Sequence, residues 1–332
     1  MTILVTGGAG YIGSHMVHEL VDAGEPVVVL DNLSTGFRFL IPAAVPFVAG
    51  STGDRELVAK TIRQYGITAI VHFAASIVVP DSVRNPLGYY RNNTMNTCAL
   101  LDTAIEAGVR QVIFSSTAAV YGNAEETPVR EDTVTLPISP YGSSKLMSEI
   151  MLHDAGKAYG LRFVILRYFN VAGADPRGRT GQSSPGATHL IKVACEAALG
   201  RRPGMAIYGT DYATPDGTCV RDYIHVSDLA RAHSAALGYL RRGGANTTFN
   251  CGYGHGSSVL QVIDAVRRAS GRDFPVEIAP RRAGDPPALV ADASRIRSTL
   301  SWQPQFQDLD TIVAHAYSWE RRLAAKRSTA AA

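Results

Sequence analysis

The feature that most constrains the fold is a glycine-rich turn near the start of the chain. An apolar run, Ile3 to Val5, comes directly before it, and a helical pattern, Ser14 to Leu20, comes directly after it. Its glycines are Gly7, Gly10 and Gly13. Gly7 permits a tight turn, Gly10 lets a pyrophosphate approach the backbone, and Gly13 lets the helix pack closely. We therefore expect a dinucleotide at the start of this helix, where free N–H groups favour phosphate.

A carboxylate narrows the choice of dinucleotide. The second predicted strand, 26–30, ends at Asp31, which follows Gly13 at about the spacing, roughly 20 residues, of a group that holds a ribose diol. A carboxylate at this place would repel a 2′-phosphate, so the sequence favours NAD over NADP. The alternative is a structural glycine turn followed by a surface aspartate.

Composition excludes several classes of protein. The chain has 332 residues, enough for about two lobes, and a formal net charge of +3, which argues against binding driven by bulk charge to nucleic acid or to a membrane surface. No apolar run approaches the roughly 20 residues of a membrane span, and no signal sequence precedes the first strand. The cysteines are scattered, so we expect no metal site and a cytoplasmic protein with reduced thiols: Cys98, Cys195, Cys219 and Cys251.

Strand and helix signals alternate through the first half. Strands are predicted at 3–5, 27–30, 46–48, 70–73, 112–114 and 163–166, with helices between them, for example at 56–65 and 96–107. This alternation predicts an α/β fold, a Rossmann-type doubly wound parallel sheet whose ligands lie beyond the carboxyl ends of the strands.

After about residue 170 the sequence becomes rich in loops. Helices are predicted at 189–200, 226–240, 259–270 and 310–322, with a strand at 247–250. We expect an NAD-binding domain at 1–170 and a smaller substrate-binding domain at 171–332, with a segment near 219–252 returning to the first domain.

Hydroxyl and amine groups suited to proton transfer follow the fifth strand. That strand leads into three hydroxyl residues, 115–117, and Tyr141 and Lys145 stand four apart at the start of a predicted helix. This spacing places both side chains on one face. A nearby ammonium and a cationic nicotinamide ring favour the phenolate and lower its pKa from about 10, so Tyr141 could act as a base. The alternatives are helix capping by the hydroxyls and an ordinary surface helix.

Two other strand ends carry candidate contacts. His72 to Ala75 ends the fourth strand with small residues that leave room for a cofactor, whereas His72 itself is expected to be a hydrogen-bonded core histidine. Asn170 ends the sixth strand and could contact substrate or nicotinamide.

Together these motifs resemble the extended short-chain dehydrogenase/reductases, and within them the UDP-glucose 4-epimerases. The resemblance extends from Thr2 to about Trp319. The motifs that carry it are Gly7 to Gly13, Asp31 with Asn32, His72 to Ala75, Tyr89 to Asn93, Ser115 to Thr117, Tyr141 with Lys145, Arg167 to Asn170, Gly217 to Val226 and Ala279 to Asp285.

The resemblance implies a mechanism and a set of contacts. Tyr141 would take the proton of a sugar 4-hydroxyl, Thr117 would share the hydrogen bond, and Lys145 would bind the nicotinamide ribose. NAD would accept the hydride and return it to the other face of a 4-keto sugar. Residues implied to line NAD are Gly7, Gly10, Tyr11, Ile12, Gly13, Asp31, Asn32, Phe73, Ala74, Ala75, Asn92, Ser115, Tyr141, Lys145 and Tyr168. Residues implied to hold the UDP-sugar are Thr117, Asn170, His189, Leu190, Ala206, Tyr208, Arg221, Arg282 and Asp285.

The chain also departs from the family pattern. Ile77 stands where some members carry Lys, Ser51 replaces an Asp on the adenine side, and His189 replaces Asn. Leu289 stands where a bulky Tyr or a smaller residue controls entry of N-acetylated sugars. The resemblance further suggests a homodimer, formed through helices near 96–107 and 146–159.

Alternatives to a UDP-hexose 4-epimerase stay open. A UDP-N-acetylhexosamine or UDP-pentose 4-epimerase would need the same catalytic residues. A nucleotide-sugar 4,6-dehydratase would need an Asp-Glu pair after Thr117, where this chain has Ala118 and Ala119. A non-catalytic NAD sensor would not need Tyr141 or Lys145.

Overall fold

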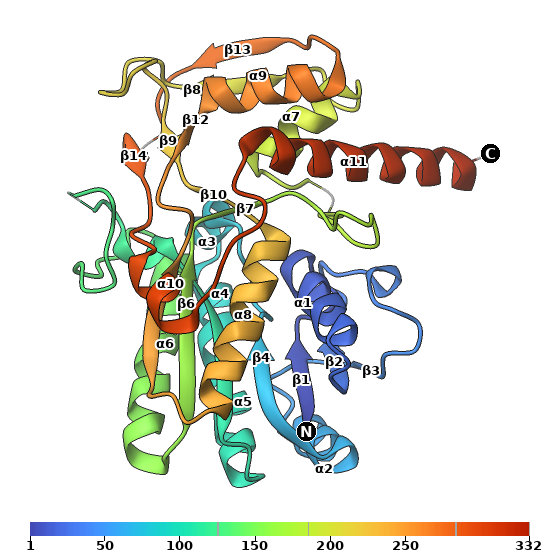
Figure 1. Cartoon of the computed structure of the whole chain (residues 1–332), viewed down its shortest axis with the longest axis vertical. Helices are drawn as coiled ribbons and strands as arrows, with labels where there is room; N and C mark the ends of the chain where they lie inside the picture. Colours follow the sequence, from blue (N-terminus) through green and yellow to red (C-terminus); the bar gives the residue numbers. More distant parts are fainter. Residues whose placement is uncertain (125, 185, 283, 332) are drawn as a thin grey trace.

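A parallel sheet of seven strands organises the molecule. The computed structural model describes residues 1–124, 126–184, 186–282 and 284–331. The strand order is β11-β6-β5-β4-β1-β2-β3 (Figure 1). The order reverses between β1 and β4, and a doubly wound sheet binds ligands at that crevice. The strands are β1 (Thr2–Thr6), β2 (Val27–Asp31), β3 (Phe47–Ala49), β4 (Ile67–His72), β5 (Gln111–Thr117), β6 (Arg162–Tyr168) and β11 (Thr247–Cys251).

Helices bury both faces of this sheet. α1 (Tyr11–Asp22) and α8 (Val226–Arg241) cover one face, and α2 (Arg55–Tyr65), α5 (Asn96–Glu106) and α6 (Pro140–Tyr159) cover the other (Figure 1). Successive residues of a strand point to opposite faces. Ile3 and Val5 therefore pack in the core under α1 and α8, whereas Leu4 packs under the other three helices. This double burial explains why the strands are continuous apolar runs.

Local signals set the helix ends. Asp54 caps α2 by accepting the Leu57 N–H, and Ser139 caps α6 by accepting the Gly142 N–H. α6 then ends at Gly160, whose left-handed backbone (φ 67°) glycine adopts without strain. The start of α6 decides where its first turn, which carries Tyr141 and Lys145, meets the sheet.

Apart from β11, α8 and α10 (Ser294–Leu300), which lie in or against the sheet, most of the second half of the chain forms a smaller lobe above the sheet (Figure 1). Three helices pack together there: α7 (Leu190–Ala198), α9 (Val259–Ser270) and α11 (Leu309–Ala331). Short strands accompany them: β8 (Met205–Tyr208) with β13 (Val276–Ala279), and β9 (Val220–Arg221) between β12 (Ser257–Ser258) and β14 (Ala288–Leu289). β7 (Asn170–Ala172) and β10 (Tyr223–His225) pair where the lobe meets the sheet.

Short helices complete the described fold. One follows β2, three follow β4, one follows β5, and one precedes α11. They are η1 (Arg38–Leu40), α3 (Val79–Arg84), α4 (Pro86–Tyr89), η2 (Tyr90–Met95), η3 (Ala118–Tyr121) and α10 (Ser294–Leu300).

The predicted α/β class and doubly wound parallel sheet are confirmed. The predicted strands overlap the observed ones, although β4 ends at His72 and leaves Phe73 outside. The part of the chain after about residue 170, which the sequence indicates to be rich in loops, nevertheless contains the short strands β8, β9 and β14. Strands of two to four residues form through pairing across the chain, so their local sequence carries little signal.

Within the described part of the chain, no helix is long and apolar enough to cross a membrane.

Candidate active site

The turn after β1 is a cradle made of backbone. Gly7 has a left-handed backbone (φ 68°), and a Cβ on it would lie 2.6 Å from the Ala74 nitrogen. A Cβ on Gly13 would lie 2.2 Å from the Gly7 carbonyl oxygen. Gly13 therefore lets α1 pack closely against the turn, as the sequence predicts. Gly10 is the N-cap of α1 and has no side chain to cap it. The first N–H groups of α1 stay available for an anion.

Asp31 ends β2 beside this cradle. It is buried, its Oδ2 accepts the Ala9 N–H at 2.9 Å, and its Oδ1 accepts the Leu33 N–H at 2.7 Å. Burial raises the pKa of Asp31, and these two hydrogen bonds oppose the rise. The carboxylate is thus fixed against the turn after β1, where the sequence places a ribose. Asn32 follows it and is exposed.

The chain leaving β4 faces the cradle. Ala74 touches Gly7, as the glycine geometry requires, and Phe73 packs its ring 4.8 Å from the ring of His233. Ala75 follows, and both alanines are partly buried. Asn92 donates to the Ser76 hydroxyl at 2.9 Å and so lies beside the same segment. His72 bonds to two threonine hydroxyls inside the sheet, so it is the satisfied core histidine that the sequence predicts.

The ends of β5 and β6 bring together side chains that are distant in the sequence. The Ser115 hydroxyl lies 2.8 Å from His233 Nε2, and it also hydrogen-bonds Tyr168. His233 Nδ1 lies 2.9 Å from the Leu229 carbonyl, so Nδ1 carries the proton and Nε2 accepts from Ser115. Burial lowers the pKa of His233 to about 4, which keeps the ring neutral. Sequence reasoning missed this histidine because no local signal relates α8 to β5.

Tyr141, Thr117 and Lys145 meet as predicted at the start of α6. All three are buried, and the Thr117 hydroxyl lowers the pKa of the Tyr141 phenol. The Lys145 ammonium lies 4.2 Å from the centre of the Phe114 ring. Gly142 lets the start of α6 approach η3 closely, because a Cβ on Gly142 would lie 2.6 Å from the Ala119 carbonyl oxygen.

Burial controls the acidity of this group. It raises the pKa of Tyr141 to about 12, although the hydrogen bond from Thr117 opposes the rise. It lowers the pKa of Lys145 to about 7, and the Glu149 carboxylate opposes that change. The sequence predicted a lowered phenol pKa, whereas desolvation outweighs the neighbouring polar groups in this structure. A phenolate here needs positive charge beside it.

The predicted substrate residues fall into three sets of contacts. One cavity is lined by Asn170, His189 and Leu190, together with Tyr11 and with Tyr223, which sequence reasoning missed. Tyr11, which the sequence predicts to contact NAD, therefore lines the same cavity as three residues predicted to contact the substrate.

The other two sets lie on the short strands of the upper lobe. Arg282 stacks 3.8 Å from the ring centre of Tyr208, which shares β8 with Ala206. Arg221 on β9 donates to the Pro286 carbonyl at 2.9 Å and lies 3.6 Å from Asp285. The Arg282 guanidinium is therefore held by β8, and the Arg221 guanidinium by Asp285 and Pro286.

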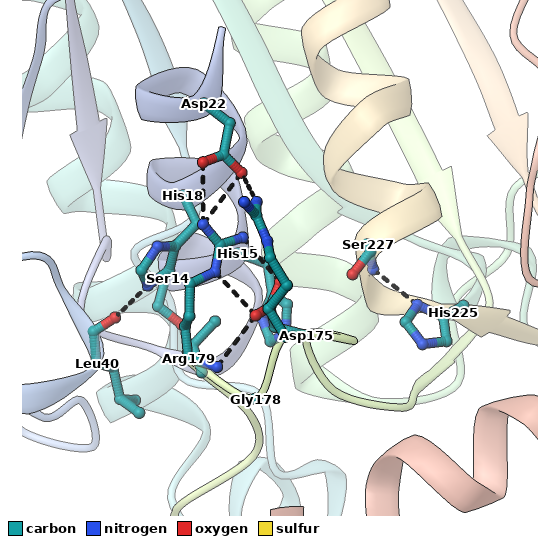
Figure 2. Close-up of polar contacts among 12 residues, drawn as sticks. Ser14, His15, His18, Asp22, Leu40, Asp175, Gly178, Arg179, His225 and Ser227 are labelled. Carbon is teal, nitrogen blue, oxygen red and sulfur yellow. Dashed lines mark hydrogen bonds and ion pairs between the residues drawn. The ribbon is translucent and has the colours of Figure 1, made fainter. Parts of the chain in front are cut away.

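The loop between β7 and α7 is fastened to the side of α1. Arg179 lies between Asp22 and Asp175 (Figure 2), at 3.0 Å from Asp22 Oδ1 and 2.8 Å from Asp175 Oδ1. The Ser14 and Thr180 hydroxyls are 2.6 Å apart. The helix that presents its N-terminus to the cradle therefore also fixes the loop that leads to α7.

The departures from the family pattern lie at the edges of this site. Ile77 is exposed, and the Ser51 hydroxyl accepts the Gly53 N–H at 3.1 Å. His189 is the N-cap residue of α7, and its Nδ1 lies 2.7 Å from Gln182 Nε2. Leu289 pairs in register with Arg221. The described residues contain no group of three or more His, Cys, Asp or Glu that could hold a metal ion.

A family model described as the NAD dependent epimerase/dehydratase family matches residues 3–252. The chain belongs to this family. It is 62% identical to a UDP-glucose 4-epimerase of Azospirillum brasilense over 97% of this chain and 92% of that protein. It superimposes on the UDP-glucose 4-epimerase of Brucella ovis in complex with NAD with a TM-score of 0.93, at 46% identity and with 96% and 97% of the two chains covered.

A third likeness is to the UDP-glucose 4-epimerase of Bifidobacterium longum in complex with NAD⁺ and UDP. The TM-score is 0.92 at 37% identity, with 97% of this chain and 98% of that chain covered. Membership of the epimerase family confirms the resemblance predicted from the motifs, and it confirms NAD as the cofactor.

Proposed function

We propose that this protein catalyses the NAD-dependent 4-epimerisation of UDP-hexoses and interconverts UDP-glucose and UDP-galactose through a 4-keto sugar. The observation that carries the proposal is that Thr117, Tyr141 and Lys145 are all buried where the end of β5 meets the first turn of α6, at strand ends that also form the glycine cradle. The relatives that bear the name UDP-glucose 4-epimerase support it.

The cradle fits a dinucleotide because it is made of backbone. A Cβ on Gly7 or Gly13 would overlap backbone atoms, so the turn stays open only with glycine at these positions. The uncapped start of α1 would hold the pyrophosphate, and Asp31 a ribose diol. The chemistry that bound NAD would supply is a hydride acceptor and donor for sugar C4, together with a cationic ring that would favour the Tyr141 phenolate.

The protein's own residues move the proton. Tyr141 takes it from the 4-hydroxyl and returns it to the 4-keto oxygen. The Thr117 hydroxyl accepts the Ala119 N–H at 3.1 Å, so its own hydrogen is free to bond the Tyr141 oxygen. A Lys145 ammonium, one helical turn from Tyr141, would supply positive charge that favours the phenolate.

The nucleotide end of the substrate would be held by the upper lobe. Guanidinium groups bind phosphates in pairs of hydrogen bonds, which suits Arg221 and Arg282. Loose contacts to the hexose would let the keto sugar turn while UDP stays bound. Binding energy from the non-reacting nucleotide is then used at the sugar.

A dehydratase reaction would require a carboxylic acid after Thr117. Ala118 and Ala119 occupy these positions in η3, and Ala118 is buried. No acid or base for the elimination of water is therefore available in η3, which favours epimerisation over dehydration.

A turnover panel tests the proposal. The purified protein should interconvert UDP-glucose and UDP-galactose without added NAD. UDP-xylose and the two UDP-N-acetylhexosamines are measured beside them, since Leu289 leaves sugar size open. Turnover confined to the pentose or to the N-acetylated pair would contradict the hexose assignment. No turnover of any sugar by NAD-loaded protein would contradict epimerisation.

The assembly that we propose is a homodimer. Exposed apolar side chains lie together on η2, α5 and α6, where Met95, Met147 and Ile150 face solvent beside the exposed Cys98. Such a patch on neighbouring helices suits a symmetric contact between two copies. Light scattering after size exclusion should give twice the chain mass, and Ile150→Glu should halve it. A monomeric wild-type protein would contradict the dimer.

Two further expectations stay proposals. The division into an NAD-binding domain, 1–170, and a substrate domain, 171–332, is supported by the position of α7, α9 and α11 above the sheet, while β11 and α8 return to the first domain. A cytoplasmic location is supported by four free thiols.

A further inference from the structure

A buried ion pair lies beneath the proposed catalytic group. Arg167 Nη2 is 2.6 Å from Glu149 Oε2, and the side chains are only 9% and 2% exposed. Arg167 Nε is 3.1 Å from Oε1 of the same carboxylate. The Ser116 hydroxyl donates to Glu149 as well. Both carboxylate oxygens therefore have charged or hydroxyl donors, as a buried charge requires.

Each member of this cluster adjoins a residue of the site. Ser116 directly precedes Thr117, and Arg167 directly precedes Tyr168. Glu149 follows Lys145 by one turn of α6, so the two side chains share a face of the helix. The ends of β5 and β6 thus hold the carboxylate one helical turn from the lysine on α6.

The remaining donors of Arg167 are used on the far side of the cluster. Its Nη1 donates to the Tyr121 hydroxyl at 3.0 Å and to the Glu131 carbonyl at 3.3 Å. Tyr121 in turn donates to Asn250 Oδ1 at 2.7 Å. The guanidinium is thus bonded to α6, to η3 and to the segment at Glu131, which leaves the position of the Glu149 carboxylate little freedom.

The surroundings of Lys145 contain few other charges. His72 of β4 is buried and neutral, with a pKa lowered to about 3, and Phe114 of β5 presents its ring. On α6 itself, Glu149 is the carboxylate that acts on the lysine, and it raises the lysine pKa against the effect of burial. Tyr141 is faced by Thr117, Tyr89 and Tyr168, which carry no charge at neutral pH.

We propose that Glu149 is a positioning residue that keeps Lys145 in its ammonium form beside Tyr141, with Ser116 and Arg167 holding the carboxylate in place. The proposal rests on the proposed epimerase function and deepens it. Glu149 does not touch the substrate, yet it sets the protonation of the base through the lysine.

The test is the pH dependence of kcat/KM of NAD-loaded enzyme. In Glu149→Gln, Lys145 loses its proton more readily, and the Tyr141 phenolate then forms only at higher pH. The acid limb of the profile should move up by about one pH unit, kcat at pH 7 should fall about tenfold, and KM for UDP-glucose should not change. Glu196→Gln is the matched control. Glu196 lies on α7, is also buried, and pairs with Arg202, whose Nε is 2.5 Å from the Glu196 carboxylate. This variant should leave the profile unchanged.

Two more variants separate the effect of the Glu149 charge on the pH profile from any damage to the fold. Glu149→Gln combined with Arg167→Gln leaves no unpaired buried guanidinium and so folds more readily. It also removes the cation of the pair, so its acid limb should move in the same direction but by less. Glu149→Asp keeps the charge, so its acid limb should stay at the wild-type pH even where kcat falls. An unmoved acid limb in folded, NAD-loaded Glu149→Gln would overturn the proposal.

A readout without turnover distinguishes this failure from failure of the proposed function. Tyrosinate absorbance of the NAD-loaded protein is titrated in the wild type and the double variant, with Tyr141→Phe as background. The Tyr141 transition should move up in pH in the double variant. If the wild type does not epimerise but the transition moves, the proposed function fails and the role of Glu149 stands.

Discussion

The sheet and the upper lobe position their functional residues in different ways. Thr117 ends a strand of seven residues, and Tyr141 begins a helix of twenty, both packed against buried cores. Arg221 stands on a strand of two residues, held by a carbonyl and a carboxylate of one loop. Regular structure therefore fixes the proposed catalytic residues, whereas loop contacts fix the proposed nucleotide-binding residues.

This difference carries a functional expectation. Substitutions in the sheet region should change kcat or NAD binding, because they alter groups at the reacting centre or in the cradle. Substitutions in the upper lobe should change KM, because they alter groups that hold the non-reacting part of the substrate.

The largest effect should come from Tyr141→Phe. The ring stays packed, but the proton acceptor is gone, so kcat should fall about a thousandfold with NAD binding retained. Steady-state kinetics and the NAD content of the purified variant measure this. Activity close to wild type would mean that another residue is the base.

The next effect should come from Gly13→Ala. The added methyl would meet the Gly7 carbonyl oxygen at 2.2 Å, so the variant should lose about 2 kcal/mol of stability and most of its bound NAD. In the control Gly238→Ala, the methyl meets only the end of the flexible Arg242 side chain, at 3.1 Å. That variant should change stability by no more than about 1 kcal/mol and keep its NAD. Denaturant unfolding measures the stability of both variants, and NAD absorbance measures how much cofactor each retains.

In the upper lobe, Arg221→Ala should raise KM for UDP-glucose about 10- to 100-fold with little change in kcat, since a hydrogen bond to a charged group is lost in both ground and transition states. Arg267→Ala removes a surface guanidinium of α9, paired with Asp264 and Asp273, and serves as the control. A fall in kcat at unchanged KM would contradict the expectation that residues of the upper lobe act on substrate binding alone.

The smallest effect that we expect is a loss of folding stability at acid pH, contributed by each buried histidine of the sheet region. Burial lowers the pKa of His15 and His233 to about 4 and of His72 to about 3. The unfolded chain binds protons on these rings near pH 6.5, so the folded state loses stability as pH falls below that value. Each histidine should cost about 1 kcal/mol at pH 5.5 relative to pH 7.5. Denaturant unfolding at both pH values checks this, and equal stability would contradict neutral buried rings.

Much of the sheet region could be predicted because its signals are local. The order of apolar strands, the three glycines and the Tyr141–Lys145 spacing all follow from short stretches of chain, and each was found where it was expected. Ser115 and Tyr168 were also placed, yet their link to His233 was not, because α8 returns to the sheet from a distant part of the sequence. The short strands β8, β9 and β14 escaped prediction for a similar reason.

The sequence by itself determined the fold class, NAD as cofactor and the identity of the proposed base, since these depend on periodicity and on residue types at fixed spacing. Only the tertiary structure decided the electrostatics of the site. Burial raises the pKa of Tyr141 and lowers that of Lys145, and the carboxylate that opposes the second change is held by side chains from β5 and β6. Desolvation and long-range pairing depend on what the folded chain packs around a group, which spacing along the sequence does not specify.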